Sequence, residues 1–547
     1  MAGAGGCYCR RRGTAAAIST TTATPRPGPW RGILLGSLPA LALLLGCTPL
    51  SQYDVWWHLR TGQIIREMGA VPRLDLFTYT SSTRPWIDVY WLYQVALAWL
   101  YQLGGVSALV LLKAAADAGI VGLSMLGRQA GARAWPLALA WLPGLLMVSG
   151  SLSERPEAVS LVLLAAYMVL LARAPRAPRS LWLLPALQVL WVNCHGFFVL
   201  GPLLLLAYSG EWLVERLWPP ALPAARPPVR TFAAVAGLTL LACLANPYGL
   251  HAVSLPLEQL HKVGSGAGIY RETIAELKST GDLIAQSGLS NPYLLAYFLS
   301  VLLGVGSFIL CARRARLRLY RAGLFVAGAV LAWQATRNSG LFGVIAVLVT
   351  TWNLDDALAA RESSARARRR PDPDAVLLAA VGALALATVS GGLYAWAGEG
   401  RRVGLGERPR WFDHDACAFL ARPDLPARMV AYNIGQAAVC IAHGAPAHKQ
   451  FMDLRLEVNT QETYERYLAG IRLLRRNDRG WEQALGIDYD RPEELPAILI
   501  ERGPLGRAAE ILSHDPRWRL VFADDQATVF VATRFAEQHG LRAVSLR

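Results

Sequence analysis

Ionisable residues gather in the loops on one side of a chain whose remaining length is dominated by long apolar runs. The longest of these loops, 51–90, contains Asp54, Asp75 and Asp88 among many aromatic residues. Carboxylates at a membrane surface can act as a general base, or can hold a divalent cation on a phosphate. The three aspartates are therefore the candidate catalytic residues, and Asp54 is also a candidate metal ligand.

A second set of polar residues belongs to the same side. His58 follows Asp54 in the long loop, Arg155 lies in SERPE, Asn193 and His195 lie in WVNCHG, and Arg337 lies in TRNSG. Arginines can clamp phosphate oxygens at two points, and Trp or Tyr rings can stack on a sugar or lie at headgroup level. This combination suits a substrate with a lipid tail, a phosphate and a polar head, so these five residues are the candidate substrate-binding residues.

Each candidate also has a purely structural explanation. Asp54 can mark the end of the first helix, Asp75 can cap or turn the loop, and Asp88 can cap the helix that follows it. Asn193 and His195 stand at a helix break, where side chains often satisfy the freed backbone groups. Residue type and spacing alone leave both interpretations open.

Long apolar helices must position these loops. The chain has 547 residues, of which 54% are hydrophobic and 17% charged, against about 45–50% apolar and about 25% charged in soluble chains. A spanning helix needs about 20 mostly apolar residues. Eleven runs qualify, and we expect a mainly α, polytopic bundle over 32–397 with spans at 32–50, 106–126, 134–150, 157–173, 180–194, 196–215, 231–247, 291–312, 320–336, 338–356 and 374–397.

Two segments near the N-terminus need separate interpretations. The segment 89–103 is apolar but short and rich in Trp and Tyr, so we expect an interfacial or re-entrant helix. LLGC at 44–47 resembles a lipoprotein cleavage box with Cys47 as the lipidated residue. We prefer an uncleaved helix, because the preceding tail, 1–31, is long and the apolar run leads straight into further spans. That tail is expected to be disordered and cytoplasmic.

Positive charge orients the bundle. Arginines recur in the N-terminal tail and in every second loop, as in RRARLRLYR at 313–321 and RESSARARRR at 361–370. The positive-inside rule places these loops in the cytoplasm. The formal charge of +15 is therefore explained without nucleic acid, which we exclude as a partner, and the C-terminal domain is predicted to be extracytoplasmic.

The composition changes near Gly398, where charges become scattered as in a soluble domain. Within 398–547, the segments 428–433, 496–501, 517–524 and 527–533 read as strands, and 464–476 reads as an amphipathic helix. The last two strands are joined by a short acidic turn, which predicts a hairpin. We expect a small α/β domain without a Gly-rich phosphate loop, in which Cys417 and Cys440 can form a disulfide.

Several strings together resemble a known family. DVWWHLRTG, VPRLDLFTYT and RPWIDVYWL, followed by SERPE, WVNCHGFFVLG, ANPYG, RNSG and FMDLRLEV at 451–458, resemble a large family of bacterial multi-spanning proteins. That family is related to the GT-C superfamily of glycosyltransferases, which includes protein mannosyltransferases and aminoarabinose transferases. The resemblance implies a GT-C-like fold in the bacterial inner membrane, with membrane lipids and a lipid-phosphate-linked sugar as partners.

The resemblance also implies roles. GT-C enzymes take a sugar from a polyprenyl-phosphate carrier and pass it to an acceptor at the outer membrane face. Asp54 matches the position of their acidic residue near the start of the first outer loop, as a general base or a metal ligand. Asp75 or Asp88 would be the second acidic group. Many members carry paired acids here, whereas Val55 follows Asp54, so a divalent-cation cofactor stays open.

By the same resemblance, Arg155, His195 and Arg337 would contact the lipid-linked phosphate. The leading hypothesis is thus a membrane glycosyltransferase that modifies an envelope acceptor. Two other classes remain open: a transporter or flippase of lipid-linked intermediates, which often shows internal repeats and mid-membrane polar groups, and a non-catalytic envelope assembly protein.

Overall fold

The computed structural model describes residues 28–129, 131–219, 225–265, 267–360, 372–502 and 506–545. Most of the predicted cytoplasmic tail and the arginine-rich segment 361–370 lie outside the described residues.

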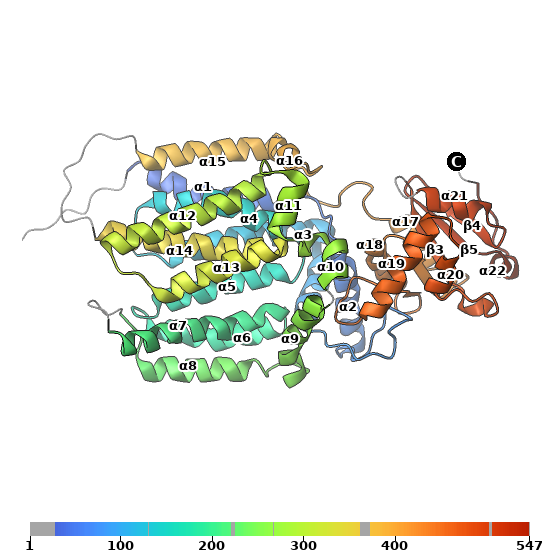
Figure 1. Cartoon of the computed structure of the whole chain (residues 1–547), viewed down its shortest axis with the longest axis horizontal. Helices are drawn as coiled ribbons and strands as arrows, with labels where there is room; N and C mark the ends of the chain where they lie inside the picture. The colour runs from blue at the N-terminus through green and yellow to red at the C-terminus, as the bar shows by residue number, and fades with distance from the viewer. Residues whose placement is uncertain are drawn as a thin grey trace, which may run out of the picture.

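Long helices that lie roughly parallel form one end of the molecule (Figure 1). They are α1 (Trp30–Gly46), α3 (Trp91–Leu126), α4 (Ala134–Ser151), α5 (Glu157–Arg173), α6 (Leu183–Val192), α7 (Leu200–Leu217), α8 (Val229–Ala242), α12 (Pro292–Arg314), α13 (Leu319–Gln334), α14 (Ser339–Ala359) and α15 (Pro373–Val389). Each predicted span therefore falls on a helix. Among the described residues, five helical segments are long and apolar enough to cross a membrane: Trp91–Leu126, Ala134–Ser151, Gly196–Leu217, Pro292–Arg314 and Thr336–Ala359. The number eleven stays a prediction.

The centre of the bundle is α14, which is buried along most of its length and packs against α4, α12 and α13. Its contact with α4 depends on glycine. A Cβ on Gly144 of α4 would lie 2.3 Å from Val347 of α14, and a Cβ on Gly343 would lie 3.1 Å from Met147. Small residues allow helix backbones to approach closely where no water drives them together. This contact fixes the neighbouring ends of α4 and α14.

The predicted interfacial helix at 89–103 is the first part of α3. Gly104 and Gly105 interrupt the helical backbone, and Gly105 has a φ of +59°, which glycine adopts without a steric penalty. The chain therefore changes direction between the two halves of α3. The first half lies beside α2 (Asp54–Met68), with which α3 makes extensive contacts.

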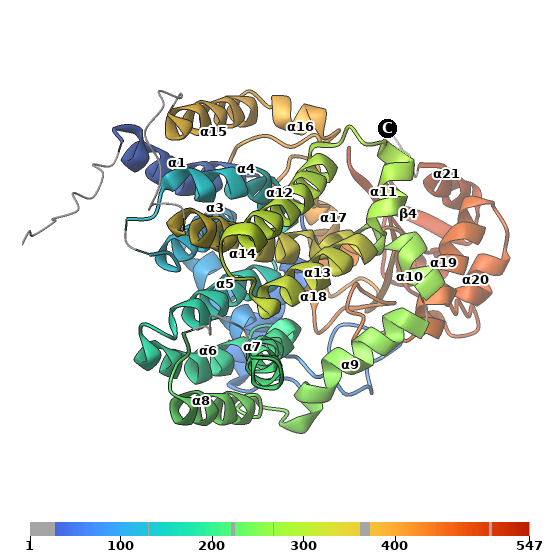
Figure 2. The ribbon, with the colours of Figure 1, turned by 60° about the vertical axis from the view of Figure 1, so that its left-hand side comes forward.

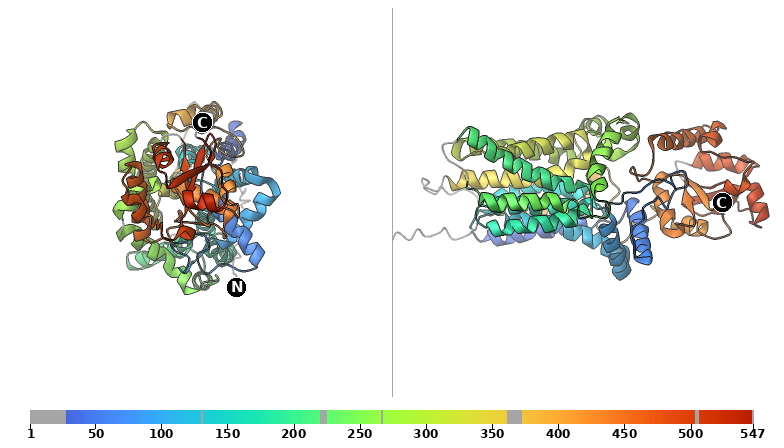
Figure 3. Two further views of the ribbon diagram at one scale, coloured as in Figure 1. Left: turned by 90° about the vertical axis from the view of Figure 1, so that its right-hand side faces the viewer. Right: turned by 90° about the horizontal axis from the view of Figure 1, so that it is seen from below.

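Shorter helices separate the bundle from the C-terminal part of the chain. Besides α2, they are α9 (Leu250–Ser265), α10 (Ala267–Thr273) and α11 (Thr280–Ser287), which run along one flank in Figure 2. A capping box at Ser279 and Asp282 begins α11. These helices and the loop 69–90 lie between the bundle and the C-terminal unit, as the right view of Figure 3 shows.

The C-terminal unit, described from α17 to α22, is built on a five-stranded sheet with the order β2-β1-β3-β5-β4. Strand β1 is parallel to β2 and β3, whereas β5 is antiparallel to β3 and β4. The strands are β1 (Arg428–Ala431), β2 (Lys449–Gln450), β3 (Ala497–Glu501), β4 (Trp518–Ala523) and β5 (Ala527–Ala532). Four of them match the predicted strands, and β4–β5 is the predicted hairpin. Strand β2 was missed because two residues carry no periodic pattern.

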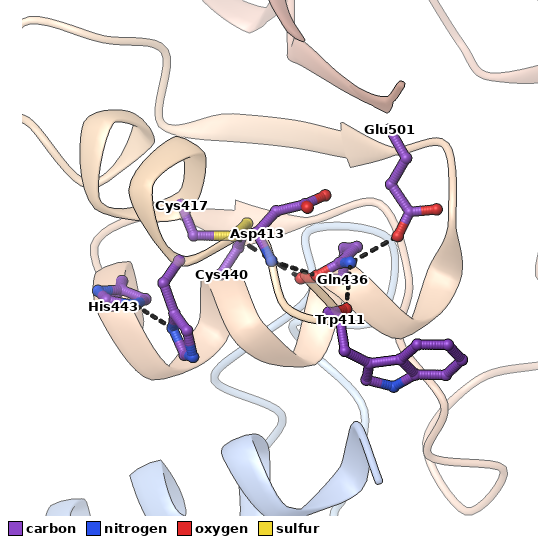
Figure 4. Close-up of a disulfide and its surroundings, with 8 residues drawn as sticks. Trp411, Asp413, Cys417, Gln436, Cys440, His443 and Glu501 are labelled. Atoms are coloured by element: carbon purple, nitrogen blue, oxygen red, sulfur yellow. Dashed lines mark hydrogen bonds between the residues drawn. A yellow bond between two sulfur atoms is a disulfide. The ribbon is translucent and has the colours of Figure 1, made fainter. Parts of the chain in front are cut away.

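Helices cover this sheet and include α17 (His414–Leu420), α18 (Ile434–Gly444), α19 (Gln461–Arg475), α20 (Gly480–Ala484), α21 (Gly506–His514) and α22 (Thr533–Gln538). A disulfide joins Cys417 of α17 to Cys440 of α18, as the sequence allowed. Beside it, Gln436 accepts a hydrogen bond from the Asp413 backbone N–H at 3.1 Å and donates one to Glu501 at 2.5 Å (Figure 4).

Replacing Cys417 and Cys440 together with alanine is expected to lower the free energy of unfolding of the C-terminal unit by about 3 kcal/mol, because the cross-link spans 23 residues and restricts the unfolded chain. Proteolysis of the detergent-solubilised protein across a urea series measures this change. Cys47→Ala, at a free and half-buried thiol, is the control. Equal midpoints for the double variant and the control would contradict the prediction.

Candidate functional site

Arg155 joins segments that are far apart in the sequence. It lies in the turn between α4 and α5, and its Nη2 is 2.9 Å from Oδ2 of Asp54, the first residue of α2. Its Nη1 is 2.7 Å from Oε1 of Glu276, in the short helix η3 (Ala275–Leu277). The other oxygen of Asp54 accepts a hydrogen bond from Trp57 Nε1 at 3.3 Å. Asp54 and Arg155, both singled out from the sequence, are therefore in direct contact.

Arg155 and Glu276 line a polar cavity of about 310 Å³, and Asp54 contacts Arg155 from outside that lining. Its basic lining residues each have an acidic partner. Lys113 lies 2.8 Å from Glu154, and Arg337 lies 2.9 Å from Glu157; Arg401 also pairs with Glu399, at 3.1 Å. An anionic ligand would have to displace one of these carboxylates to reach a cation.

Glu276 is the carboxylate most easily displaced from Arg155. Its side chain is 38% exposed, whereas that of Asp54 is 18% exposed. The partner of Lys113, Glu154, is almost completely enclosed. If Glu276 swings into solvent, Arg155 keeps its contact with Asp54 and presents a free guanidinium edge to the cavity.

The cavity lies where membrane helices begin and end. Its lining includes Ser151 at the end of α4, Glu157 at the start of α5, Tyr293 in the first turn of α12 and Ser339 at the start of α14. These helix ends are the ones that face α2 and the C-terminal unit in Figure 1. The charged groups therefore gather at one end of the bundle and not along its length.

Asn193 and His195 lie in the break between α6 and α7. Asn193 accepts a hydrogen bond from Trp91 Nε1 at 2.7 Å and donates to the carbonyls of Val189 and Ala245. It thus satisfies backbone groups, and it also lines an open, mostly apolar groove of about 710 Å³. His195 Nδ1 lies 2.8 Å from Ser160 Oγ. His195 is buried and belongs to the lining of neither the groove nor the cavity.

Asp75 lies away from the cavity. Its side chain is fully buried and accepts hydrogen bonds from the backbone N–H groups of Phe77 and Thr78 at 3.0 and 3.1 Å and from the Thr78 hydroxyl. Its Oδ1 is also 2.6 Å from Arg455 Nη2 of the C-terminal unit. These contacts favour the structural interpretation, in which Asp75 shapes the loop and holds it to that unit. Its catalytic role stays a prediction.

Asp88 and His58 form a second buried group outside the cavity lining. Asp88 Oδ1 accepts from the Tyr90 backbone N–H at 3.1 Å and from Gln94 Nε2 at 3.0 Å, and the same Nε2 lies 3.3 Å from His58 Nδ1. Burial, with a smaller effect from Glu457, raises the pKa of Asp88 to about 8. A carboxyl group that is mainly protonated at neutral pH is a poor general base.

The sequence analysis missed several residues of the cavity. Lys113 is a lone lysine in a predicted span, which is in itself a signal for a polar partner inside the bundle. Glu154 and Glu157 flank the arginine that was chosen in SERPE. Glu276 carried no such signal, because the loop around it contains many other charged residues.

The described residues do not fit the expected divalent cation. They contain no group of three or more His, Cys, Asp or Glu side chains able to hold a metal ion. Asp54 is occupied by Arg155 and Trp57, and none of Asp54, Asp75 and Asp88 belongs to the cavity lining. We therefore derive no step through a metal.

Comparison with known proteins gives a likeness to solved structures. No protein-family model matches the chain, and no curated protein matches it. Among solved structures, it is similar to the crystal structure of the Archaeoglobus fulgidus oligosaccharyltransferase in the apo form, at 10% sequence identity and a TM-score of 0.48. That alignment covers 86% of this chain and 69% of the archaeal chain.

Replacing Asp88 with asparagine is expected to stabilise the protein increasingly as the pH rises from 5 to 8. The folded protein keeps the Asp88 proton up to about pH 8, whereas an unfolded chain releases it near the usual pKa of 3.8. Wild-type stability is therefore lost as the pH rises through this window, by up to about 1.4 kcal/mol per pH unit, and asparagine removes that loss. Melting curves at several pH values measure the difference, and a pH-independent difference would show that Asp88 is ionised when folded.

Proposed function

We propose that this protein is a membrane glycosyltransferase that moves a sugar from a polyprenyl-phosphate donor to a cell-envelope acceptor at the outer face of a bacterial inner membrane. The observation that carries the proposal is the contact between Asp54 and Arg155 beside a polar cavity at the ends of apolar helices. A general base and a phosphate-binding cation stand there side by side.

Two surfaces of the protein suit such a donor. The groove lined by Leu92, Val189, Leu190 and Leu244 offers apolar walls to a lipid tail. The cavity offers the guanidinium groups of Arg155 and Arg337 to the phosphate. Glu276 would give up its place on Arg155 when that phosphate arrives.

The transfer needs one proton acceptor and one stabilised leaving group. Asp54 takes the proton of the acceptor hydroxyl while that oxygen bonds to the anomeric carbon of the sugar. The bond from the anomeric carbon to the phosphate oxygen breaks at the same centre, and polyprenyl phosphate leaves with an added negative charge. Arg155 and Arg337 would stabilise that developing charge.

The position of the polar residues argues against a transporter. Alternating access requires a binding site near the middle of the membrane, whereas most of the cavity lining comes from helix ends and from the turns between them. The arginine-rich loops at the opposite end support a cytoplasmic location for that end. The C-terminal unit would then lie outside the cytoplasm.

Asp54→Asn is expected to lower transfer about 1,000-fold, because it removes the general base while keeping the size of the side chain. The measurement is transfer of radiolabel from polyprenyl-phosphate mannose and polyprenyl-phosphate aminoarabinose into the envelope fraction of membranes that carry the protein. Asp525→Asn, at an exposed carboxylate of the C-terminal unit, is the matched control. Full activity in a correctly inserted Asp54→Asn variant would remove the basis of the proposal.

The orientation is tested by labelling. A cysteine placed at Arg472, exposed on α19, is expected to react with a membrane-impermeant maleimide in intact spheroplasts. A cysteine at Arg314, at the opposite end of α12, should react only after the membrane is permeabilised. The reverse pattern would place the C-terminal unit in the cytoplasm and contradict the proposed acceptor side.

A further inference from the structure

Arg455 is a fully buried arginine at the contact between the C-terminal unit and the first outer loop. Its Nη2 lies 2.6 Å from Oδ1 of Asp75 in that loop and 2.6 Å from Oδ2 of Asp453. Its Nε lies 2.9 Å from Asp453 as well. Removing an arginine from water is costly unless its donors are met; the two carboxylates meet Nε and Nη2 and so orient the guanidinium, whereas the buried Nη1 has no hydrogen-bond partner.

Three aromatic rings surround that guanidinium. Its central carbon lies 4.5 Å from the ring centre of Trp86, 4.7 Å from that of Phe77 and 5.8 Å from that of Trp57. Trp86 and Phe77 belong to the outer loop, which the ion pair with Asp75 already fastens. Trp57 belongs to α2, so the third contact reaches a different element.

Trp57 connects Arg455 to the candidate site. It stands one helical turn after Asp54 on α2, and its indole N–H donates to Asp54 Oδ1. The other oxygen of Asp54 lies against Arg155. A rotation of the indole would withdraw this donor and leave the carboxylate held on one side only. The orientation of Trp57 therefore sets that of Asp54.

We infer that Arg455 is a positioning residue for Asp54, through which the C-terminal unit completes the site in the membrane domain. The inference rests on the proposed function for its effect on transfer. Arg455 would act by fixing the plane of Trp57 through cation–π contact while its own plane is fixed by Asp75 and Asp453. Lysine cannot replace it, because an ammonium group has neither the planar fork nor the flat face.

The first test does not depend on any substrate. The protein is labelled with 5-fluorotryptophan in nanodiscs, and Trp57→Phe identifies the fluorine resonance of Trp57 among those of the 18 tryptophans. Arg455→Lys and Asp54→Asn are each expected to shift that resonance. The shift of the double variant should differ from the sum of the two single shifts, because both changes act on one indole.

Two controls separate positioning from misfolding. Arg472→Lys, at an exposed arginine of the same unit, should leave the Trp57 resonance in place. Resistance of Cys417 and Cys440 to alkylation shows that the unit has folded. If Arg455→Lys does not fold, Asp75→Asn, which weakens the hold on Arg455 but keeps the shape of the loop, takes its place with a smaller shift expected.

The second test measures transfer from polyprenyl-phosphate mannose and aminoarabinose. Arg455→Lys and Trp57→Phe are each expected to lower kcat by about 100-fold, the effect of a misplaced reacting group, with less than about a threefold change in the donor KM. The double variant should be no slower than the slower single variant.

An unmoved Trp57 resonance in folded Arg455→Lys overturns the inference whatever the activity. The inference is also overturned if the fold-losses in kcat of the two single variants multiply in the double variant. Full transfer by Asp54→Asn instead overturns the proposed function, and the Trp57 resonance still decides whether Arg455 orients the indole.

Discussion

The arrangement of the candidate site depends on the neutralisation of Arg155. Two carboxylates meet its guanidinium, one from the start of α2 and one from η3 in the long loop before α12. Each ion has lost part of its hydration, so removing the arginine leaves two carboxylates uncompensated, whereas removing Glu276 leaves Arg155 paired with Asp54. This single group therefore determines how α2 and the 275–277 segment sit on the turn between α4 and α5.

The other basic residues of the cavity are also neutralised by carboxylates. Lys113 meets Glu154, Arg337 meets Glu157 and Arg401 meets Glu399, so the site is rich in charge but close to balanced. A site of this kind can admit an anion only by exchange of one carboxylate for another. Exchange favours a ligand that brings its own negative charge to the place where Glu276 now lies, which is consistent with a phosphate-bearing donor.

The proposed role of Arg455 makes the C-terminal unit a part of this site. Asp75 and the aromatic residues around it do not reach the cavity, but they accommodate Arg455, whose ring contacts extend to Trp57 and so to Asp54. The bundle supplies the fixed frame, because glycines at the α4–α14 contact bring those helices together without gaps. The proposed transfer would thus depend both on the helical bundle and on the docking of the C-terminal unit against it.

Local patterns in the sequence were enough to predict the helices of the bundle and most strands of the C-terminal sheet. Hydrophobic runs predicted the helices of the bundle, and the alternation of apolar and polar residues predicted β1, β3, β4 and β5. The spacing of loops and spans placed Asp54, Arg155 and Arg337 at one end of the molecule. These features follow from hydrophobicity and backbone periodicity, which act over a few residues and can be read in order along the chain.

Only the tertiary structure decided which of the candidate acids contacts Arg155. Asp54, Asp75 and Asp88 are similar by type and loop, yet one contacts Arg155, one is held by Arg455, and one is enclosed with Gln94. Ion pairs form over a few ångströms between residues that can be hundreds of positions apart, and the desolvation that makes them strong exists only after the segments have packed. No local pattern in the sequence therefore predicts which residues form these ion pairs.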